Sequence, residues 1–482
     1  MRLISRLKLI SRLKLLKFFG KKADTRPHIC QRVPLEIWSE IFQYLPLSVA
    51  ILMNVCKTWR QAALSSPRLW TDIMMHVDDD AYVETIEARL SRSGALGVHV
   101  ALFCGDTSAG DVDVKHRLKA TPEKQRWKSL YFDSPSFIRP LLDVKNGTRW
   151  DMLHELIMDV KGGHFDVENE PFSIMHLRAL RFLTIRATDG VSVNTFLAPW
   201  DQLAVLHLYS TWSHAADILL IVQRAIKVVL CIIVLEGAAV DNDSEPLIPP
   251  SYPRVRKHMP KMRGLFLSGG GNMAPLLSYL SAPSLQILSI TSRRFSYDRY
   301  SEARFPGSDI ACFVSASRCR LMSLELHGIN MRFDDVLICF EALRYLVLLK
   351  VTNRGVAPML TGQVLLELAR RTAHPELVLL PKLRFLRVYT PASVLSHADW
   401  LEFLKSRKYK GCPRHVSPLQ WTGRYIFRKA VSDSTEGEQL SSDQDMFTSD
   451  AVMNNLDCFS HFATLLDEAG LPFRKTFILT TS

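Results

Sequence analysis

The hexapeptide LRFLTI, residues 180–185, places apolar side chains in the order apolar-x-x-apolar-x-apolar, at Leu180, Leu183 and Ile185. Leu183 and Ile185 are two residues apart, so a β-strand would direct both side chains to the same face. The pattern returns many times along the chain, and such recurrence indicates stacked structural units rather than one closed core. This recurring hexapeptide therefore decides the fold that the sequence predicts.

The copies are LHELIM, LRFLTI, LAVLHL, LCIIVL, MRGLFL, LQILSI, LMSLEL, LRYLVL and LRFLRV, beginning at residues 153, 180, 203, 230, 262, 285, 321, 343 and 383. Their mean spacing, about 29 residues, leaves room for a helix and two loops after each strand, as in leucine-rich repeats. The asparagine that usually follows the strand of such a repeat is absent, so the repeats are irregular. GVHVALF (97–103) and WKSLYF (127–132) are two weaker members upstream.

The predicted fold class is α/β, with a small unit of three helices followed by an irregular leucine-rich-repeat solenoid with a curved parallel sheet. We expect the solenoid over residues 96–431, and we expect repeat helices at 172–180, 216–226, 273–280 and 361–371. A connecting segment, 77–95, should hold one helix at 81–93. Three aspartates at 78–80 precede that helix, and carboxylates favour the positive end of a helix dipole, so we interpret them as a cap rather than a metal cluster.

The three-helix unit begins with VPLEIWSEIFQYLP, Val33–Pro46. Its apolar residues Trp38, Ile41, Phe42 and Leu45 are spaced as one helical stripe, with Pro34 in the first turn and Pro46 as the stop. A second piece is expected at 47–52, and a third carries Val55, Trp59 and either Ala62 or Ala63 on one face. Residues 68–75 look extended. Three short helices are too few for an independent core, so this unit should need a partner.

The stretch from Val33 to Trp70 resembles an F-box. The matching features are Pro34-Leu35-Glu36-Ile37, Ile41-Phe42, Leu45-Pro46, Val55-Cys56-Lys57-x-Trp59-Arg60, Leu64 and Leu69-Trp70. They cover under a tenth of the chain, and we assign 27–76 to this domain. An F-box followed by irregular leucine-rich repeats is similar to the F-box families that are expanded in mushroom-forming fungi.

The resemblance implies that the domain binds a Skp-family adaptor and, through it, a cullin–RING ubiquitin ligase. The residues implied in adaptor binding are Pro34, Leu35, Ile37, Ile41, Phe42, Leu45, Pro46, Val55, Cys56, Trp59 and Leu64. The repeats would hold an unknown target protein. Such a receptor has no catalytic residues, no metal and no cofactor of its own, and it would work in the cytoplasm, the nucleus or both.

The net charge of +12 is concentrated at the N-terminus. Residues 1–22 contain eight basic residues and no acidic one, so the remaining 460 residues carry only four of the net positive charges. A basic tail on a nearly neutral body is not the footprint of a duplex-binding domain, and we expect no nucleic-acid partner. For the tail, residues 1–26, four interpretations stay open: a mobile tail without an address, a mitochondrial presequence, a membrane-surface anchor and a nuclear signal.

Motifs for catalysis are scarce. The nine cysteines include no C-x-x-C pair and fit free thiols, and there is no HExxH, Walker loop or G-x-S-x-G. Gly269-x-Gly271-x-x-Ala274 matches a loose dinucleotide fingerprint, but the following strand supplies no acid, so we favour a repeat turn. Residues 432–450 are acidic and serine-rich and predict a linker or long loop, and 451–482 predict a terminal helix and strand.

Two function classes remain open at this point: a substrate receptor of a ubiquitin ligase, and a repeat scaffold whose F-box helices only pack on its own first repeat. An exposed Leu35/Ile41/Phe42 stripe would favour the receptor, and a stripe covered by repeats would favour the scaffold. A third class, an enzyme that uses the glycine loop at 269–274, would require a deep pocket there.

Overall fold

The computed structural model describes residues 33–45, 49–77, 81–103, 124–133, 142, 150–160, 172–188, 193–210, 215–235, 255–269, 273–292, 306–353, 358–391, 394–407 and 415–427. The chain divides into two compact units, 1–427 and 428–482, and all described residues belong to the first. The basic tail, the three aspartates at 78–80, Gly271 and the segments expected at 432–450 and 451–482 lie outside the described residues.

The N-terminal helical domain contains α3 (Leu35–Gln43), α4 (Val49–Val55), α5 (Lys57–Leu64) and the 3-10 helix η2 (Pro67–Trp70). Cys56 caps α5, because its Sγ accepts a hydrogen bond from the backbone N–H of Trp59. Val55 therefore belongs to α4. The sequence analysis had placed it in the third helix, which is wrong. The segment 68–75 is likewise only partly extended, since it begins in η2.

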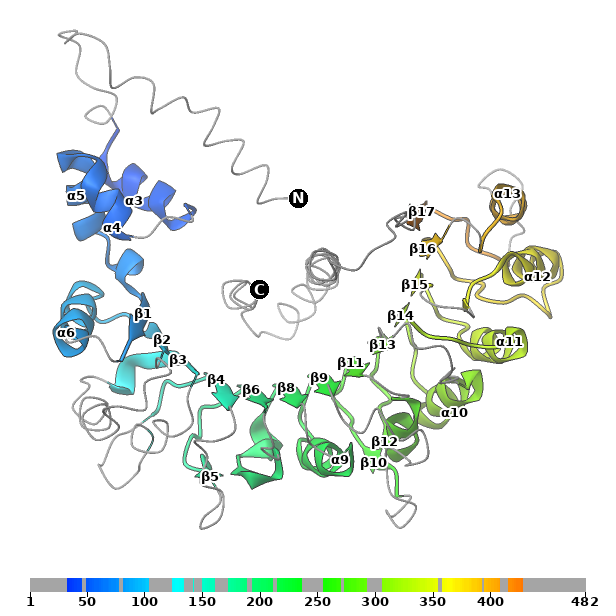
Figure 1. Ribbon diagram of the computed structural model, residues 1–482, viewed down its shortest axis with the longest axis horizontal. Helices are drawn as coiled ribbons and strands as arrows, with labels where there is room; N and C mark the ends of the chain where they lie inside the picture. The colour runs from blue at the N-terminus through cyan, green and yellow to red at the C-terminus, as the bar shows by residue number, and fades with distance from the viewer. Residues whose placement is uncertain are drawn as a thin grey trace, which may run out of the picture. The chain divides into compact units, whose positions relative to one another are not determined.

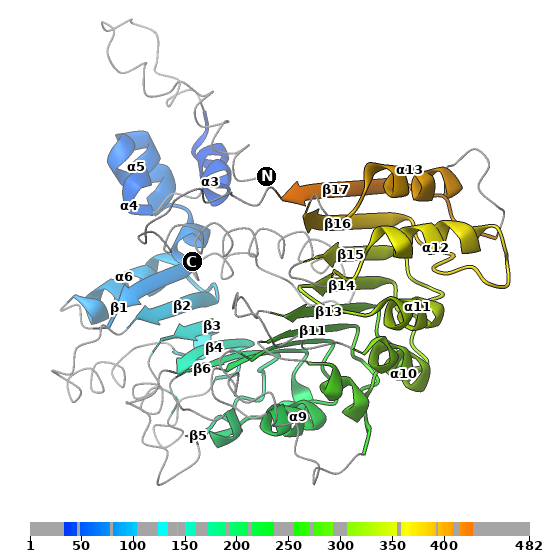
Figure 2. The ribbon, with the colours of Figure 1, turned by 45° about the vertical axis from the view of Figure 1, so that its right-hand side comes forward.

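One parallel sheet of thirteen strands follows, with its strands side by side in chain order. The strands are β1 (Asp72–His76), β2 (Val98–Phe103), β3 (Trp127–Phe132), β4 (Glu155–Val160), β6 (Phe182–Ala187), β8 (Val205–Ser210), β9 (Leu230–Leu235), β11 (Gly264–Gly269), β13 (Ile287–Ser292), β14 (Ser323–His327), β15 (Leu348–Thr352), β16 (Phe385–Pro391) and β17 (Trp421–Phe427). Every neighbouring pair is parallel, and the arrows in Figure 2 point the same way. The predicted α/β fold with a parallel repeat sheet is confirmed.

The helices of the repeats lie on one face of this sheet (Figure 1). They are α6 (Tyr82–Arg92), α9 (Ala215–Arg224), α10 (Gly307–Ser317), α11 (Phe333–Ala342), α12 (Gly362–Thr372) and α13 (His397–Ser406). The 3-10 segments are η3 (Lys124–Arg126), η5 (Val193–Thr195), η6 (Trp200–Gln202) and η7 (Ala274–Tyr279), and the short strand pairs are β5 (Phe172–Ser173) with β7 (Phe196–Leu197) and β10 (Lys257–His258) with β12 (Leu280–Ser281). Strands are about 4.8 Å apart and helices about 10 Å wide, so stacking the two layers curves the sheet with the helices outside.

The core lies between the sheet and this outer layer. The two strand positions of the hexapeptide point into it: Leu183 and Leu206 are paired across β6 and β8, as are Ile185 and Leu208, and all four are buried. The first position of the hexapeptide, for example Leu180, is buried in the turn before the strand. Because each unit shares its apolar layer with its neighbours, one continuous cluster runs from Ile73 to Phe403.

Two of the nine hexapeptides have a different register from the predicted one. In β9, Cys231 pairs with Leu206, so the repeat begins at Val228 instead of Leu230. In β15, Leu349 pairs with Leu324, so that repeat begins at Leu346 instead of Leu343. Leu346 is buried just before the strand and is not part of it.

The predicted helices are partly correct. Those at 216–226 and 361–371 correspond to α9 and α12, and the one at 273–280 is the 3-10 helix η7. The helix predicted at 172–180 is wrong: Phe172–Ser173 forms β5, which pairs with β7, and turns follow. The segment at 77–95 holds α6 between β1 and β2, so it is the helix of the first repeat rather than a connector.

Candidate functional site

The N-terminal helical domain has a small aromatic core of its own. The ring centroids of Trp38 and Phe42, one helical turn apart on α3, are 5.8 Å from each other, and Trp59 of α5 lies 5.0 Å from Trp38 and 4.9 Å from Phe42. Trp38 and Phe42 are buried, together with Leu52, Ala62 and Ala63. The three helices thus share a small buried cluster, because three aromatic rings supply much apolar area to few residues. That they are too few for an independent core stays a prediction.

The same three helices also present large apolar side chains to solvent. The exposed fractions are 51% for Ile37, 39% for Ile41, 63% for Tyr44, 51% for Ile51, 39% for Val55 and 42% for Leu64. Ile37 and Ile41 of α3 and Tyr44, which caps its C-terminus, follow the spacing i, i+4, i+7 and share one face. On α4, Ile51 and Val55 are four residues apart. We call these six residues the exposed apolar set.

The predicted adaptor-binding residues separate into three groups. The exposed ones are Pro34, Ile37, Ile41, Val55 and Leu64, and the half-buried ones are Leu35, Leu45, Cys56 and Trp59. Phe42 is buried, and Pro46 lies outside the described residues. Five of the eleven are therefore open to a partner as the domain stands.

Phe42 corrects the sequence interpretation. Only 2% of its surface is exposed, and Trp38 and Trp59 cover its ring. The stripe predicted from Trp38, Ile41, Phe42 and Leu45 therefore divides: Trp38 and Phe42 face inward, and Ile41 faces outward. A helix of nine residues can present two apolar faces, and the spacing of one stripe does not say which face meets its own core.

Tyr44 and Ile51 belong to the exposed apolar set but were not among the predicted residues. A signal for them exists in the sequence, because Tyr44 is seven residues after Ile37 and three after Ile41, and Ile51 is four before Val55. This second stripe is as regular as the first.

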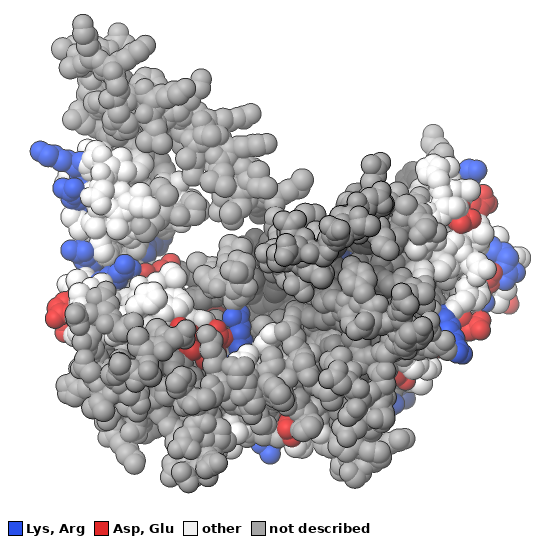
Figure 3. All heavy atoms as spheres, in the orientation of Figure 1, with Lys and Arg blue, Asp and Glu red and all other residues white. Residues whose placement is uncertain are grey.

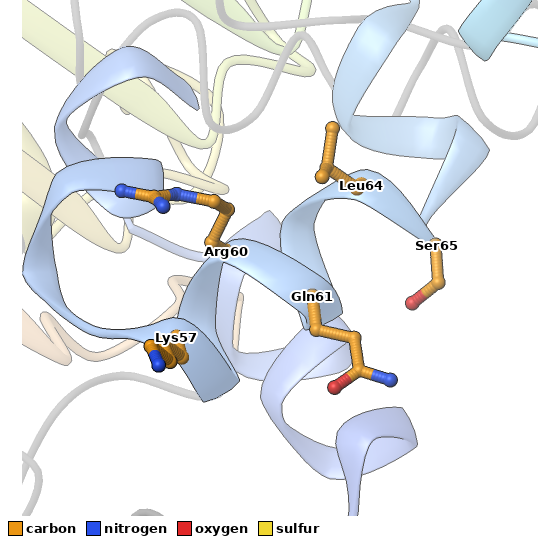
Figure 4. Close-up of a pocket in the computed structure, with 5 residues that line it drawn as sticks. All are labelled: Lys57, Arg60, Gln61, Leu64 and Ser65. Carbon is orange, nitrogen blue, oxygen red and sulfur yellow. The ribbon is translucent and has the colours of Figure 1, made fainter.

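A shallow hollow of about 440 Å³ lies beside α5 and is lined by Lys57, Arg60, Gln61, Leu64 and Ser65 (Figure 4). Arg60 is partly held in place, since its Nε–H donates to the carbonyl of Met53 at 2.9 Å. On the face that Figure 3 shows, the described part of this domain is mostly uncharged, with lysine and arginine side chains at its margin. Acid also borders the exposed apolar set, because Glu40 of α3 is exposed and accepts a hydrogen bond from the Tyr44 hydroxyl at 3.4 Å.

Trp70 connects the domain to the first repeat. Its indole Nε1–H donates to the carbonyl of Ala63 in α5 at 2.9 Å, and the guanidinium of Arg92 in α6 lies 4.4 Å from the centre of the ring. In the next residue, the Thr71 carbonyl accepts the backbone N–H of His99 in β2 at 2.8 Å. These contacts involve none of the exposed apolar set, whose members keep 39–63% of their surface exposed beside the repeats.

Other chemistry is not apparent in the described ranges. No group of three or more His, Cys, Asp or Glu side chains there is arranged to hold a metal ion, and none of the helices in those ranges combines the length and hydropathy needed to cross a membrane. Gly269 ends β11, and a Cβ at that position would lie 2.8 Å from the sulfur of Met273 and 3.1 Å from the carbonyl oxygen of Leu235. This glycine is thus explained by close packing in the repeat.

Comparison with known proteins adds one assignment. Residues 30–76 match the family model described as F-box-like, and no curated protein matches the chain. Among solved structures, the chain is similar to a Bacteroides fragilis protein determined by a structural-genomics consortium, with 15% identity, a TM-score of 0.30, and coverage of 67% of this chain and 71% of that chain. That likeness is too small to carry an argument. An F-box-like domain thus occupies residues 30–76, and the long parallel repeat sheet follows it.

Proposed function

We propose that this protein is the substrate-receptor subunit of a cullin–RING ubiquitin ligase. The observation that carries the proposal is the exposed apolar set on an F-box-like domain that already has its own core. A domain that has a small core of its own, yet leaves six large apolar residues exposed, is suited to bind another protein. The F-box resemblance implies that this protein is a Skp-family adaptor, which would in turn bind a cullin.

Burial of this surface would supply useful affinity. Each exposed isoleucine would contribute about 1 kcal/mol on binding, roughly half of what burial of a fully exposed side chain gives. Ile37 and Ile41, which share one face of α3, would act at the centre of the contact. The half-buried Leu35, Leu45, Cys56 and Trp59 would contribute less, because they already pack within the domain.

The repeats would bind the target protein. A ligase receptor needs no chemistry of its own, because holding the target near the activated ubiquitin is what accelerates the transfer. The link through Trp70 supports this role, since it joins the adaptor-binding domain to the repeat sheet by a buried side chain instead of a free linker. We place this function in the cytoplasm or the nucleus.

The alternative is a repeat scaffold without a ligase role. It predicts that the repeats cover the Leu35/Ile41/Phe42 stripe. Ile41 is exposed, Leu35 is half-buried, and Phe42 is covered by Trp38 and Trp59 of its own domain, which favours the receptor.

Co-purification tests the proposal. The full chain is co-expressed with a Skp-family adaptor and a cullin and separated by size-exclusion chromatography. We expect one complex that contains all three proteins. Elution of the chain apart from the adaptor at micromolar concentration would contradict the receptor function and leave the scaffold.

A further inference from the structure

Strand β1 forms an open edge of the thirteen-stranded sheet. It stands first in the row of strands (Figure 1) and pairs with β2 in parallel. The carbonyl of Thr71 accepts a hydrogen bond from β2 at 2.8 Å, and the backbone N–H of Val77 donates one to β2 at 2.9 Å. Every second residue of a strand bonds to a given neighbour. The residues in between, Asp72, Met74 and His76, therefore direct their backbone N–H and C=O groups away from β2.

Most of this edge lacks a hydrogen-bond partner among the described residues. The Nη1 of Arg89 donates to the Asp72 carbonyl at 3.1 Å, whereas no described residue bonds to the backbone of Met74 or His76 from the open side. Native sheets commonly protect such an edge with lysine, proline or a bulge. The sequence of β1, DIMMH, contains neither lysine nor proline, and its pairing with β2 has no register shift. This edge is therefore open to the addition of a strand.

The side chains that point away from the core are also uncovered at this edge. Ile73 and Met75 are buried in the core, so the alternating residues Asp72, Met74 and His76 lie on the opposite face. All three are exposed, and Met74 keeps 57% of its surface. An exposed methionine by itself is ordinary. Here its backbone groups are open as well, so a single added strand can contact both its main chain and its side chain.

A row of aromatic rings ends at the same edge. The ring centre of His76 lies 5.5 Å from that of Phe103 in β2, and Phe103 lies 5.3 Å from Tyr131 in β3. Tyr131 is held in place, because its hydroxyl donates to Oδ2 of Asp159 at 2.7 Å. His76 is the last ring of this row, since no strand of the sheet follows β1 on that side. An aromatic residue on an added strand would extend the row, and such cross-strand pairs stabilise sheets.

We propose that the open edge of β1 binds an extended segment of the target protein as an additional strand. The rows of β1 define the segment: a basic residue beside Asp72, an apolar residue beside Met74 and an aromatic residue beside His76, at alternate positions. Main-chain hydrogen bonds give the affinity, and these three side chains give the selectivity. The inference rests on the proposed function only in naming the segment as part of a target.

The size of the edge favours a target segment over a second copy of the chain. β1 has five residues, and two such edges paired with each other would by themselves bury less than the roughly 1,200 Å² of a stable interface. A target that the repeats already hold needs only a small additional contact, because the second contact is then intramolecular. β1 begins two residues after Trp70, so the bound segment lies at the end of the sheet that follows the F-box-like domain.

The probe is a short fluorescent peptide in which lysine, phenylalanine and tyrosine alternate with threonine, titrated with the full chain and followed by fluorescence anisotropy. Its control has the same composition in an order without this alternation. Two further peptides carry backbone N-methyl groups, one on the threonines and one on the other three residues. Because N-methylation removes the donors along one edge of a strand and keeps those of the other edge, only one of these two peptides can still pair with β1.

The test variant of the protein is Met74→Lys, which places a charge on the edge where the lysine of the peptide binds. The matched control is Met322→Lys, which alters a methionine of comparable exposure, 46%, outside β1. Melting temperatures show that both variants are folded, and the methylated peptides test the proposal on the unaltered protein.

We expect the alternating peptide to bind at least tenfold more tightly than its control. One N-methylated peptide should lose at least tenfold in affinity and the other about twofold or less. Met74→Lys should lose about tenfold, whereas Met322→Lys should stay within about twofold. Adaptor co-purification is measured on the same chain: its failure contradicts the receptor function, and the peptide results bear on this edge alone. Equal affinity of the two methylated peptides, or of the alternating peptide and its control, would overturn the proposal, as would a dimer that Met74→Lys dissociates in light scattering.

Discussion

The indole of Trp70 lies between the F-box-like domain and the first repeat, and its Nε1–H donates a 2.9 Å hydrogen bond to the carbonyl of Ala63. Only 3% of Trp70 is exposed, and Arg92 covers its ring at 4.4 Å. The residue thus contacts helices of both parts at once. In the proposed ligase this contact would fix how the target-binding repeats are presented relative to the adaptor, which a flexible linker would not do.

Replacement of Trp70 by phenylalanine should weaken this junction without affecting the adaptor surface. The Ala63 carbonyl would keep only the long 3.4 Å bond from the Ser66 backbone N–H. We expect a loss of about 1 kcal/mol and faster hydrogen exchange over residues 57–76. Trp59→Phe is the matched control, because the Trp59 indole N–H makes no hydrogen bond among the described residues. Equal exchange in both variants would show that the hydrogen bond does not hold the junction.

Phe42→Ala should unfold the F-box-like domain, because Phe42 lies in its core and not on its surface. Truncation of a buried phenylalanine costs about 3–5 kcal/mol, which is a large fraction of the stability of so small a domain. Loss of helical circular dichroism and rapid proteolysis within 33–70 would confirm this expectation. A variant that binds the adaptor with normal affinity and resists protease would contradict the buried position of the ring.

The sequence was sufficient to predict the fold class because the hexapeptide pattern reports the buried positions of each strand. The predicted register was wrong where apolar residues occupy several consecutive positions. Around Leu230, the pattern fits Leu230, Ile233 and Leu235 as well as Val228, Cys231 and Ile233, and only the pairing of Cys231 with Leu206 decides between them. A run that is apolar at every position carries no register.

For the candidate site, too, the sequence showed the apolar stripes but not which of them is buried in the domain. Helix α3 has two apolar stripes, one with Trp38 and Phe42 and one with Ile37, Ile41 and Tyr44, and a single sequence does not say which is internal. The partner that decides is Trp59, which lies far along the chain and stacks on the first stripe. The helix predicted at 172–180 failed for a similar reason, since β7 supplies the pairing partner from 24 residues further on.

Arg407 is expected to stabilise the last repeats. Only 1% of it is exposed, and its guanidinium donates to the carbonyls of Leu379 at 2.7 Å and Leu380 at 2.9 Å and to Oγ1 of Thr372 at 3.2 Å. Arg407→Met would leave buried acceptors without these donors and should cost about 2–4 kcal/mol. Hydrogen exchange over 372–407 measures the effect, with the exposed Lys405→Met as control. Equal protection in the two variants would argue against this role.

Glu367 should make the stability of the last repeats depend on pH. Hydrogen bonds from Arg370 and Arg371 lower the pKa of its carboxyl to about 2, whereas an unfolded glutamate titrates near about 4.3. Since the folded pKa is depressed, the stabilisation is present above about pH 4.3 and is lost as the pH falls toward 2. Glu367→Gln should cost about 1 kcal/mol or less at pH 7, and the gap to the unaltered protein should shrink near pH 3. Glu402→Gln is the control, and a gap that is constant with pH would contradict this ion pairing.

The most direct test of the central claim is the affinity of the adaptor for a variant with Ile37→Asp and Ile41→Asp. Both residues are exposed, so the substitutions should leave the fold and the melting temperature unchanged, yet they would bury two charges in the contact. We predict that the affinity measured by titration calorimetry falls at least a hundredfold, while Leu377→Asp, an equally exposed change in the repeats, has no effect. Adaptor binding of normal strength by the folded double variant would contradict the claim that this face of α3 is the ligase contact.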